Sequence, residues 1–216
     1  MRLWRGFGLA AVVLWPAFTE GNECITLESF ASSREGLFPE GWFSHAAAGR
    51  SVYRVHVEPG GRFVRASAKG VGIPAHLHRT WSLEEHPVLA WRWRPREFPV
   101  GAYERERGLN DSVLGVYVGF SSPWGAVKYI WSEKLPRGAE FEVGFFGRTK
   151  VVVVESGMPP DRSAWVEVRA NVAVDYKRRF KRTTLATPGG LSILTDSDDT
   201  HTYAEGDYAE FRACPQ

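Results

Sequence analysis

Residues 191–211 have the sequence LSILTDSDDTHTYAEGDYAEF, and this stretch decides how the rest of the chain is interpreted. The apolar residues at its start predict a buried strand, and a second strand is expected to begin at Gly206. Between the two strands, Asp196, Asp198 and Thr200 stand at alternate positions of an acidic loop. Two strands joined by a polar loop are typical of antiparallel sheets, so this stretch predicts a β-rich fold.

Short segments in which apolar and polar residues alternate recur along the chain, separated by turns that contain glycine and proline. Such alternation is typical of strands with one buried face. The clearest examples are residues 51–57, 62–68, 88–94 and 165–170. Residues 171–180 instead have the spacing of one short helix. The pattern predicts an all-β protein, a jelly-roll-like antiparallel β-sandwich of about ten strands with one short helix. A closed barrel is the alternative.

Residues 88–94, VLAWRWR, show how the two faces of a strand are assigned. The period of two places Leu89, Trp91 and Trp93 on one face of the strand and Arg92 on the other. We expect the tryptophans to pack in the core. Arg92 then faces either water or a groove.

Residues 1–21 combine Arg2 and Arg5 with an apolar run that is too short to span a membrane, which is typical of a signal peptide. Residues 22–216 are expected to form a single β-sandwich domain. The protein is therefore predicted to be exported, either periplasmic or secreted, with no stable membrane insertion after signal removal. Its 27 basic and 25 acidic side chains give a net charge of +2, which does not favour nucleic acid as a partner.

The chain contains two cysteines, Cys24 and Cys214, one at each end of the predicted mature protein. In an oxidising compartment such a pair favours a disulfide. The bridge would join a first and a last strand that are neighbours in the sandwich. Two buried thiols are the alternative.

The acidic loop has the pattern of a calcium-binding loop. Asp196, Asp198 and Thr200 form a D-x-D-x-T run, and Asp207 follows in the next strand. Alternate oxygen-bearing side chains in a turn can face one hard cation, so these four residues are candidate ligands of a structural Ca²⁺ ion. The alternative is a hydrogen-bonded turn, which a run of Asp and Thr also favours.

Five motifs occur together in a fixed order. They are VLAWRWRP (88–95), NDSVLGVYVGF (110–120), YIWSE (129–133), WVEVRANVAVDYKRRF (165–180) and ILTDSDDTHTYAEGDYAEF (193–211). With this combination the chain resembles the bacterial family catalogued as domain of unknown function 3047. The resemblance implies an exported β-sandwich similar to carbohydrate-binding modules, and it assigns no activity.

The resemblance also implies a set of polar positions that recur in the family. As candidate ligand-binding residues we take Asn110, Asp111, Trp131, Asn171 and Asp175. Arg92 joins them as a candidate because it is expected on the outward face of its strand.

The leading hypothesis is a non-catalytic, carbohydrate-binding-like module of the cell envelope that recognises a saccharide or envelope glycan. The first alternative is a polysaccharide-acting enzyme, a lyase or glycoside hydrolase, that uses Asp175, Asp196 or His76 with Arg92. The second alternative is a structural envelope protein without a small ligand. The sequence lacks the motifs of zinc hydrolases, serine hydrolases and nucleotide-binding enzymes, so no catalytic residue is assigned.

Overall fold

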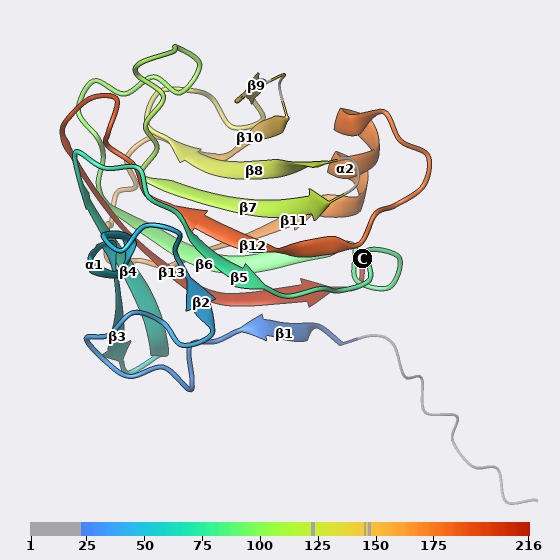
Figure 1. Cartoon of the computed structure of the whole chain (residues 1–216), viewed down its shortest axis with the longest axis horizontal. Coiled ribbons are helices and arrows are strands. Elements are labelled where there is room, and N and C mark those ends of the chain that lie inside the picture. The colour runs from blue at the N-terminus through green and yellow to red at the C-terminus, as the bar shows by residue number, and fades with distance from the viewer. Residues whose placement is uncertain (1–22, 122–123, 145, 147) are drawn as a thin grey trace, which may run out of the picture.

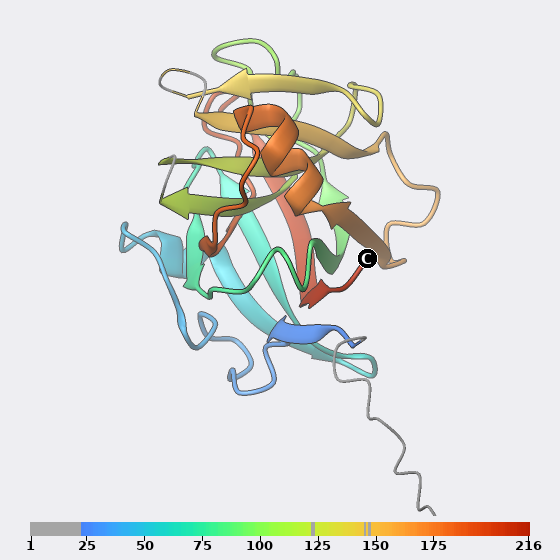
Figure 2. The same ribbon diagram turned by 90° about the vertical axis from the view of Figure 1, so that its right-hand side faces the viewer.

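The computed structural model describes residues 23–121, 124–144, 146 and 148–216. The predicted signal peptide, residues 1–21, lies outside this part of the chain. The described residues form two β-sheets that stack face to face (Figures 1 and 2). None of the helices in the described part is long and apolar enough to cross a membrane.

Sheet A has six strands, and all of its pairings are antiparallel. Its order is β11 (Val166–Asn171), β6 (Val88–Glu97), β13 (Tyr203–Cys214), β4 (Gly61–Lys69) and β3 (Tyr53–Glu58), with β1 (Ile25–Glu28) paired to β13. The 12-residue strand β13 therefore contacts three neighbours and forms the centre of this sheet.

Sheet B has seven strands. Its order is β2 (Trp42–Phe43), β5 (Ala75–His78), β12 (Pro188–Leu194), β7 (Leu114–Ser121), β8 (Trp124–Ser132), β10 (Thr149–Ser156) and β9 (Glu140–Val143). Two helices complete the described fold. Helix α1 (Gly49–Val52) precedes β3, and α2 (Val172–Phe180) closes one end of the sandwich, to the right in Figure 1.

The predicted all-β sandwich is confirmed, with three differences in detail. The described residues form 13 strands instead of about ten. The two residues of β2 are too few to show an alternation, and β9, whose sequence EFEV does alternate, is only four residues long. A second, four-residue helix is present. The sheets are not wholly antiparallel, since β10 runs parallel to β8. After β8 the chain forms the edge strand β9 and then returns as β10, which lies between β8 and β9. Because β10 is antiparallel to β9, it runs in the same direction as β8.

The core lies between the two sheets, where aromatic rings from β6 meet rings from β8. Trp91 and Trp93 are fully buried, as expected from the period of two. The ring centroids are 5.6 Å apart for Trp91 and Tyr129, and 5.9 Å apart for Trp93 and Trp131. Trp131 also donates a hydrogen bond to the carbonyl of Gly157 at 2.8 Å. This candidate ligand residue is therefore placed in the core.

Buried tyrosine hydroxyls join the sheets at the end of β12. Tyr208 of β13 donates to the carbonyl of Leu194 at 2.8 Å and accepts from the amide of Gly115 at 3.2 Å. Tyr53 of β3 contacts the carbonyl of Ile193 at 3.1 Å. Each hydroxyl thus bonds from sheet A to backbone groups of sheet B.

The two ends of the described chain are joined by a disulfide between Cys24 and Cys214, as predicted. Strand β1 directly follows Cys24 and pairs with β13, which ends at Cys214. The bridge therefore links strands that are already neighbours.

On the outer face of sheet A, the fully buried carboxylate of Asp207 binds three arginines. It accepts hydrogen bonds from Arg65 at 2.8 Å, Arg94 at 2.7 Å and Arg96 at 2.9 Å. Burial alone would raise the pKa of Asp207, but the bonds from Arg65 and Arg94 hold it below its ordinary value. Asp207 therefore stabilises this face as an anion.

Replacing Asp207 with Asn removes the buried carboxylate that binds Arg65, Arg94 and Arg96 together. Glu58 beside Arg94 and Glu205 beside Arg65 would then be the remaining anions. Breaking a buried ion pair in this way typically costs about 3–5 kcal/mol. We therefore expect Asp207→Asn to lower the free energy of unfolding by about 3 kcal/mol in urea denaturation. Glu167→Gln is the matched control, because Glu167 pairs with Arg212 on an exposed surface and is expected to contribute less than about 1 kcal/mol. Equal effects of the two substitutions would contradict this role of Asp207.

Candidate functional site

The outer face of sheet B carries two adjacent rows of side chains that run across the strands. In the first row, register pairs each residue with the next one: Phe43, His76, Ser192, Tyr117 and Lys128. In the second row the same pairing joins His78, Gly190, Gly119, Ala126 and Thr149. The alternate residues Leu77, Leu191, Val118 and Val127 point into the core. Bulky side chains therefore stand beside a strip of small ones.

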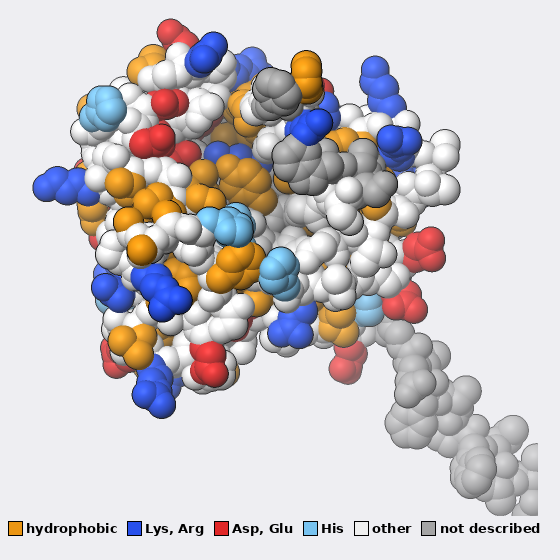
Figure 3. Space-filling model, viewed as in Figure 1, with side chains coloured by type: hydrophobic (Ala, Val, Ile, Leu, Met, Phe, Trp, Pro, Cys, Tyr) orange, Lys and Arg blue, Asp and Glu red, His pale blue; other side chains and the backbone are white. Residues whose placement is uncertain are grey.

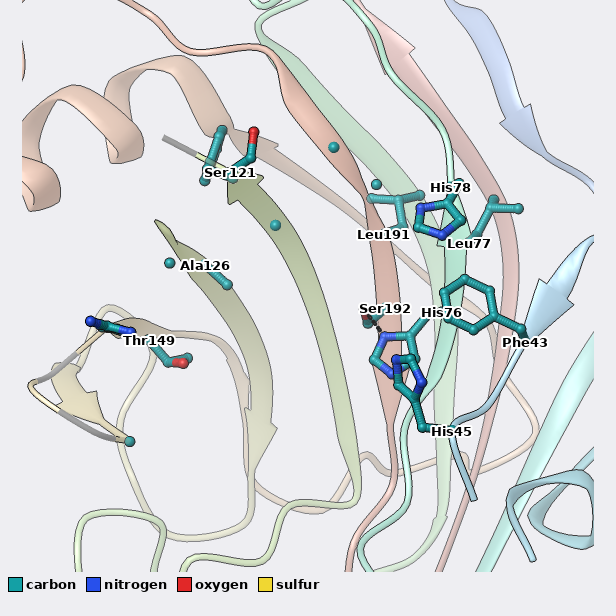
Figure 4. A pocket seen from close by; sticks show the side chains of 17 residues that line it. Phe43, His45, His76, Leu77, His78, Ser121, Ala126, Thr149, Leu191 and Ser192 are labelled. Carbon is teal, nitrogen blue, oxygen red and sulfur yellow. Dashed lines mark hydrogen bonds between the residues drawn. The ribbon is translucent and has the colours of Figure 1, made fainter. Parts of the chain in front are cut away.

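This difference in side-chain size forms a groove of about 580 Å³ along the second row. Gly119 and Gly190 lie at its floor, while Phe43 and His78 lie on one side of it and Thr149 on the other (Figure 4). In the space-filling view, histidines gather near the middle of this face beside a hollow (Figure 3). The groove is thus built from strands that are distant in the sequence.

The two floor glycines have different structural roles. A Cβ atom at Gly190 would lie 2.3 Å from the carbonyl of Leu77, so this position requires glycine for the close approach of β5. A Cβ atom at Gly119 would meet nothing closer than the carbonyl of Gly190 at 4.0 Å. A larger side chain at residue 119 would therefore fit the backbone and occupy the groove.

Phe43 and three imidazoles form one wall of the groove. The ring of Phe43 stacks on His78 at 4.7 Å and lies 5.3 Å from both His76 and His45, centroid to centroid. His76 Nδ1 is 2.7 Å from the hydroxyl of Ser192, which fixes the ring (Figure 4). Burial lowers the pKa of His76, and the nearby His45 and His78 lower it further.

At the far end of the first row lies a buried charged group. Lys128 is 6% exposed, and its ammonium lies 5.2 Å from the ring centre of Tyr117. Burial alone would lower the pKa of Lys128, but Tyr117 and Asp196 raise it above its ordinary value. Burial raises the pKa of Glu104, which accepts a hydrogen bond from Ser132. Lys128 is therefore a permanent cation that these acidic groups partly balance.

The acidic loop brings together two of the four predicted calcium ligands and adds a third carboxylate. Oxygens of Asp111, Asp196 and Asp198 lie within 4.8 Å of one another. Thr200 donates its hydroxyl to Asp111 at 2.6 Å. Asp207 is not part of this group, because it projects from sheet A into the arginines described above. Among the residues that the structure describes, this acidic cluster is the one feature that points to a cation, so calcium stays a prediction.

The structure does not gather the predicted ligand-binding residues into one place, and none of them lines the groove. Arg92 pairs with Glu210 on sheet A at 2.7 Å. Asn171 caps α2 by accepting a hydrogen bond from the amide of Val174. The remaining positions also have contacts within the protein. Asp175 accepts hydrogen bonds from Tyr129 and Arg179. The backbone N–H of Asn110 donates to Asp199, and the carboxylate of Asp111 accepts from the backbone of Asp199 and Thr200.

Sequence reasoning missed most of the residues that form the groove. The exceptions are His76, which the enzyme hypothesis names, and His78, which lies two residues further along the same predicted strand. Phe43 and His45 lie in a segment without clear alternation, and glycines at strand positions carry no chemistry of their own. The available signal was the outward placement of His76 and His78 by the period of two.

The raised pKa of Asp196 predicts a definite pH dependence of stability. Burial raises this pKa to about 6 from 3.8, so between these values the folded state binds a proton that the unfolded state does not. Stability should therefore fall as pH rises from about 4 to about 6, by up to about 3 kcal/mol. Asp196→Asn stays neutral and can still accept from Ser112, so the variant should lack this fall in pH-dependent urea denaturation.

The exposed Glu106 supplies the control for this experiment, since Glu106→Gln removes a carboxylate without changing the buried group. Its stability should follow the wild-type pH profile. A wild-type profile in Asp196→Asn would show that Asp196 does not titrate in this range.

Two solved structures align with the chain at low similarity. The xyloglucanase domain of NopAA, a type three effector from Sinorhizobium fredii, aligns with 10% identity and a TM-score of 0.43 over 84% of this chain and 98% of that one. The mannan-recognising carbohydrate-binding module TmCBM27 aligns with 12% identity and a TM-score of 0.38 over 90% and 96% of the respective chains. At these values neither comparison identifies a ligand for this protein.

No curated protein sequence matches the chain. The family described as "Protein of unknown function (DUF3047)" matches residues 40–212. This match includes the five motifs that carry the resemblance and all strands of the groove. The chain therefore belongs to the DUF3047 family.

Proposed function

We propose that the protein is an exported, carbohydrate-binding-like module that binds a saccharide in the groove on the outer face of sheet B. The observation that carries the proposal is the groove itself, with Phe43 at one side and glycines at its floor. The disulfide between Cys24 and Cys214 supports export, because such bonds persist in oxidising compartments.

The groove has the features that saccharide recognition needs. Its volume of about 580 Å³ falls within the range of about 300–1,000 Å³ that is common for small-molecule sites. A sugar ring has an apolar C–H face that packs on an aromatic ring such as Phe43, and the glycine floor allows the sugar to approach the backbone. Ser192, His76 and Thr149 supply polar atoms for its hydroxyl groups.

Binding is a better-supported proposal than hydrolysis for this groove. Glycoside hydrolysis generally uses two carboxyl groups that flank the bond to be broken. The described residues that line the groove include no Asp or Glu. The carboxylates described with raised pKa values lie elsewhere: Asp196 and Asp198 belong to the acidic loop, and Glu104 bonds to Ser132.

The substitution Gly119→Leu tests the location of the site. The leucine side chain should fill the groove without a backbone clash, so saccharide affinity should fall at least tenfold while the protein stays folded. Ligands are first found on a glycan array of neutral and acidic oligosaccharides, and affinities are then measured by titration calorimetry.

Gly60→Leu is the matched control, because a Cβ atom at this exposed turn on sheet A would meet nothing within 4 Å. It should bind like the wild type. Unchanged affinity in Gly119→Leu would place the site elsewhere, and a protein that binds no glycan on the array would overturn the proposed function.

A further inference from the structure

We propose that the saccharide bound in this groove is acidic, with its negative group placed against the imidazoles of His45, His76 and His78. The inference rests on the proposed function and deepens it by naming the class of ligand. It depends on the charges around the groove, on the arrangement of the three histidines and on their contact with Phe43.

The titratable side chains that line the groove in the described part of the chain are all basic. They are His45, His76, His78 and Arg148, and no Asp or Glu accompanies them. They come from three places in the fold: the segment after β2, strand β5 and the connection between β9 and β10. A carboxylate or sulfate that enters the groove therefore meets donors and no opposing carboxylate in its lining.

The three imidazoles are close enough to repel one another when they are protonated. The ring centroids of His45 and His76 are 5.2 Å apart, and both rings lie 5.3 Å from Phe43. The lowered pKa of His76 has burial as its first cause and the charges of His45 and His78 as the next. A bound anion would relieve this repulsion, so binding should take up protons.

Other charged groups near His76 do not reverse this expectation. Along its row, β12 contributes Ser192, β7 contributes Tyr117 and β8 contributes Lys128. Lys128 is cationic and is partly balanced by Asp196 and Glu104. The acidic loop therefore acts mainly on Lys128, while the histidines lie on the opposite side of Ser192.

The wall of the groove also matches the shape of an acidic sugar. Phe43 and His78 stack at 4.7 Å with an interplanar angle of 25°, so the two rings are nearly parallel and hold each other in place on this wall. A uronic acid presents an apolar ring face next to a carboxylate. Phe43 can cover the ring face while a neighbouring imidazolium binds the charge, because both lie on the same side of the groove (Figure 4).

Titration calorimetry with a matched pair of ligands tests the inference. The probes are oligogalacturonate and its neutral methyl ester, measured with the mature chain at about pH 5.5 and about pH 8, on either side of the ordinary histidine pKa. We expect the acid to bind at least tenfold more tightly at the lower pH. The ester should bind more weakly than the acid and should show no such pH dependence.

The double substitution His45→Gln with His78→Gln removes the two exposed imidazoles and should abolish most of the pH dependence. His56→Gln is the control, because His56 stacks on Phe63 on the other sheet and should leave binding unchanged. A pH dependence that survives the double substitution would show that these histidines do not sense the charge, and would overturn the inference.

Three further outcomes distinguish failure of this inference from failure of the proposed function. A sulfated oligosaccharide that binds in the same pH-dependent manner would support recognition of negative charge and identify sulfate as an accepted group. Equal binding of the acid and the ester would overturn the acidic ligand and leave the proposed function intact. Absence of binding to any saccharide, neutral or acidic, would overturn both.

Discussion

Hydrogen bonds from two buried tyrosines hold the sheets in one alignment, and the strands that they bind in sheet B also form the floor of the groove. Tyr208 and Tyr53 extend from sheet A to backbone groups of β12 and β7. A buried polar group that loses its partner costs about 1–3 kcal/mol, so a shift of one sheet over the other is unfavourable. The strands held in this way are those whose outer faces carry Ser192 and Gly119.

The inner faces of the two sheets form the core, and the outer face of sheet B carries the groove. Rings such as Trp91 and Trp131 fill the space between the sheets and leave little room for a ligand there. On the outer face of sheet B, Gly190 of β12 lies beside Gly119 of β7. Because neither has a side chain, a depression forms between the bulkier residues around them. The opposite outer face, on sheet A, is occupied by Asp207 and its arginines. The groove on sheet B is therefore the place to which we assign the proposed saccharide.

The fold was largely predictable, because alternation of apolar and polar residues follows directly from the geometry of a strand. That rule placed Trp91 and Trp93 in the core, and the position of the cysteines predicted the disulfide. The parallel pairing of β8 and β10 was not predictable, since alternation does not specify which strands become neighbours. The site was mostly missed for the same reason. Phe43 meets His76, and Gly119 meets Gly190, through register between distant segments.

Nuclear magnetic resonance mapping of a bound oligosaccharide tests the central claim, that the outer face of sheet B is the binding site. Amide shifts are compared for the free and the oligogalacturonate-bound protein at about pH 5.5, below the ordinary histidine pKa of about 6.5. The account predicts that the largest changes occur at Phe43, His76, Gly119 and Gly190. Changes concentrated around Arg65 and Arg94 on sheet A, or no changes with any saccharide, would contradict it.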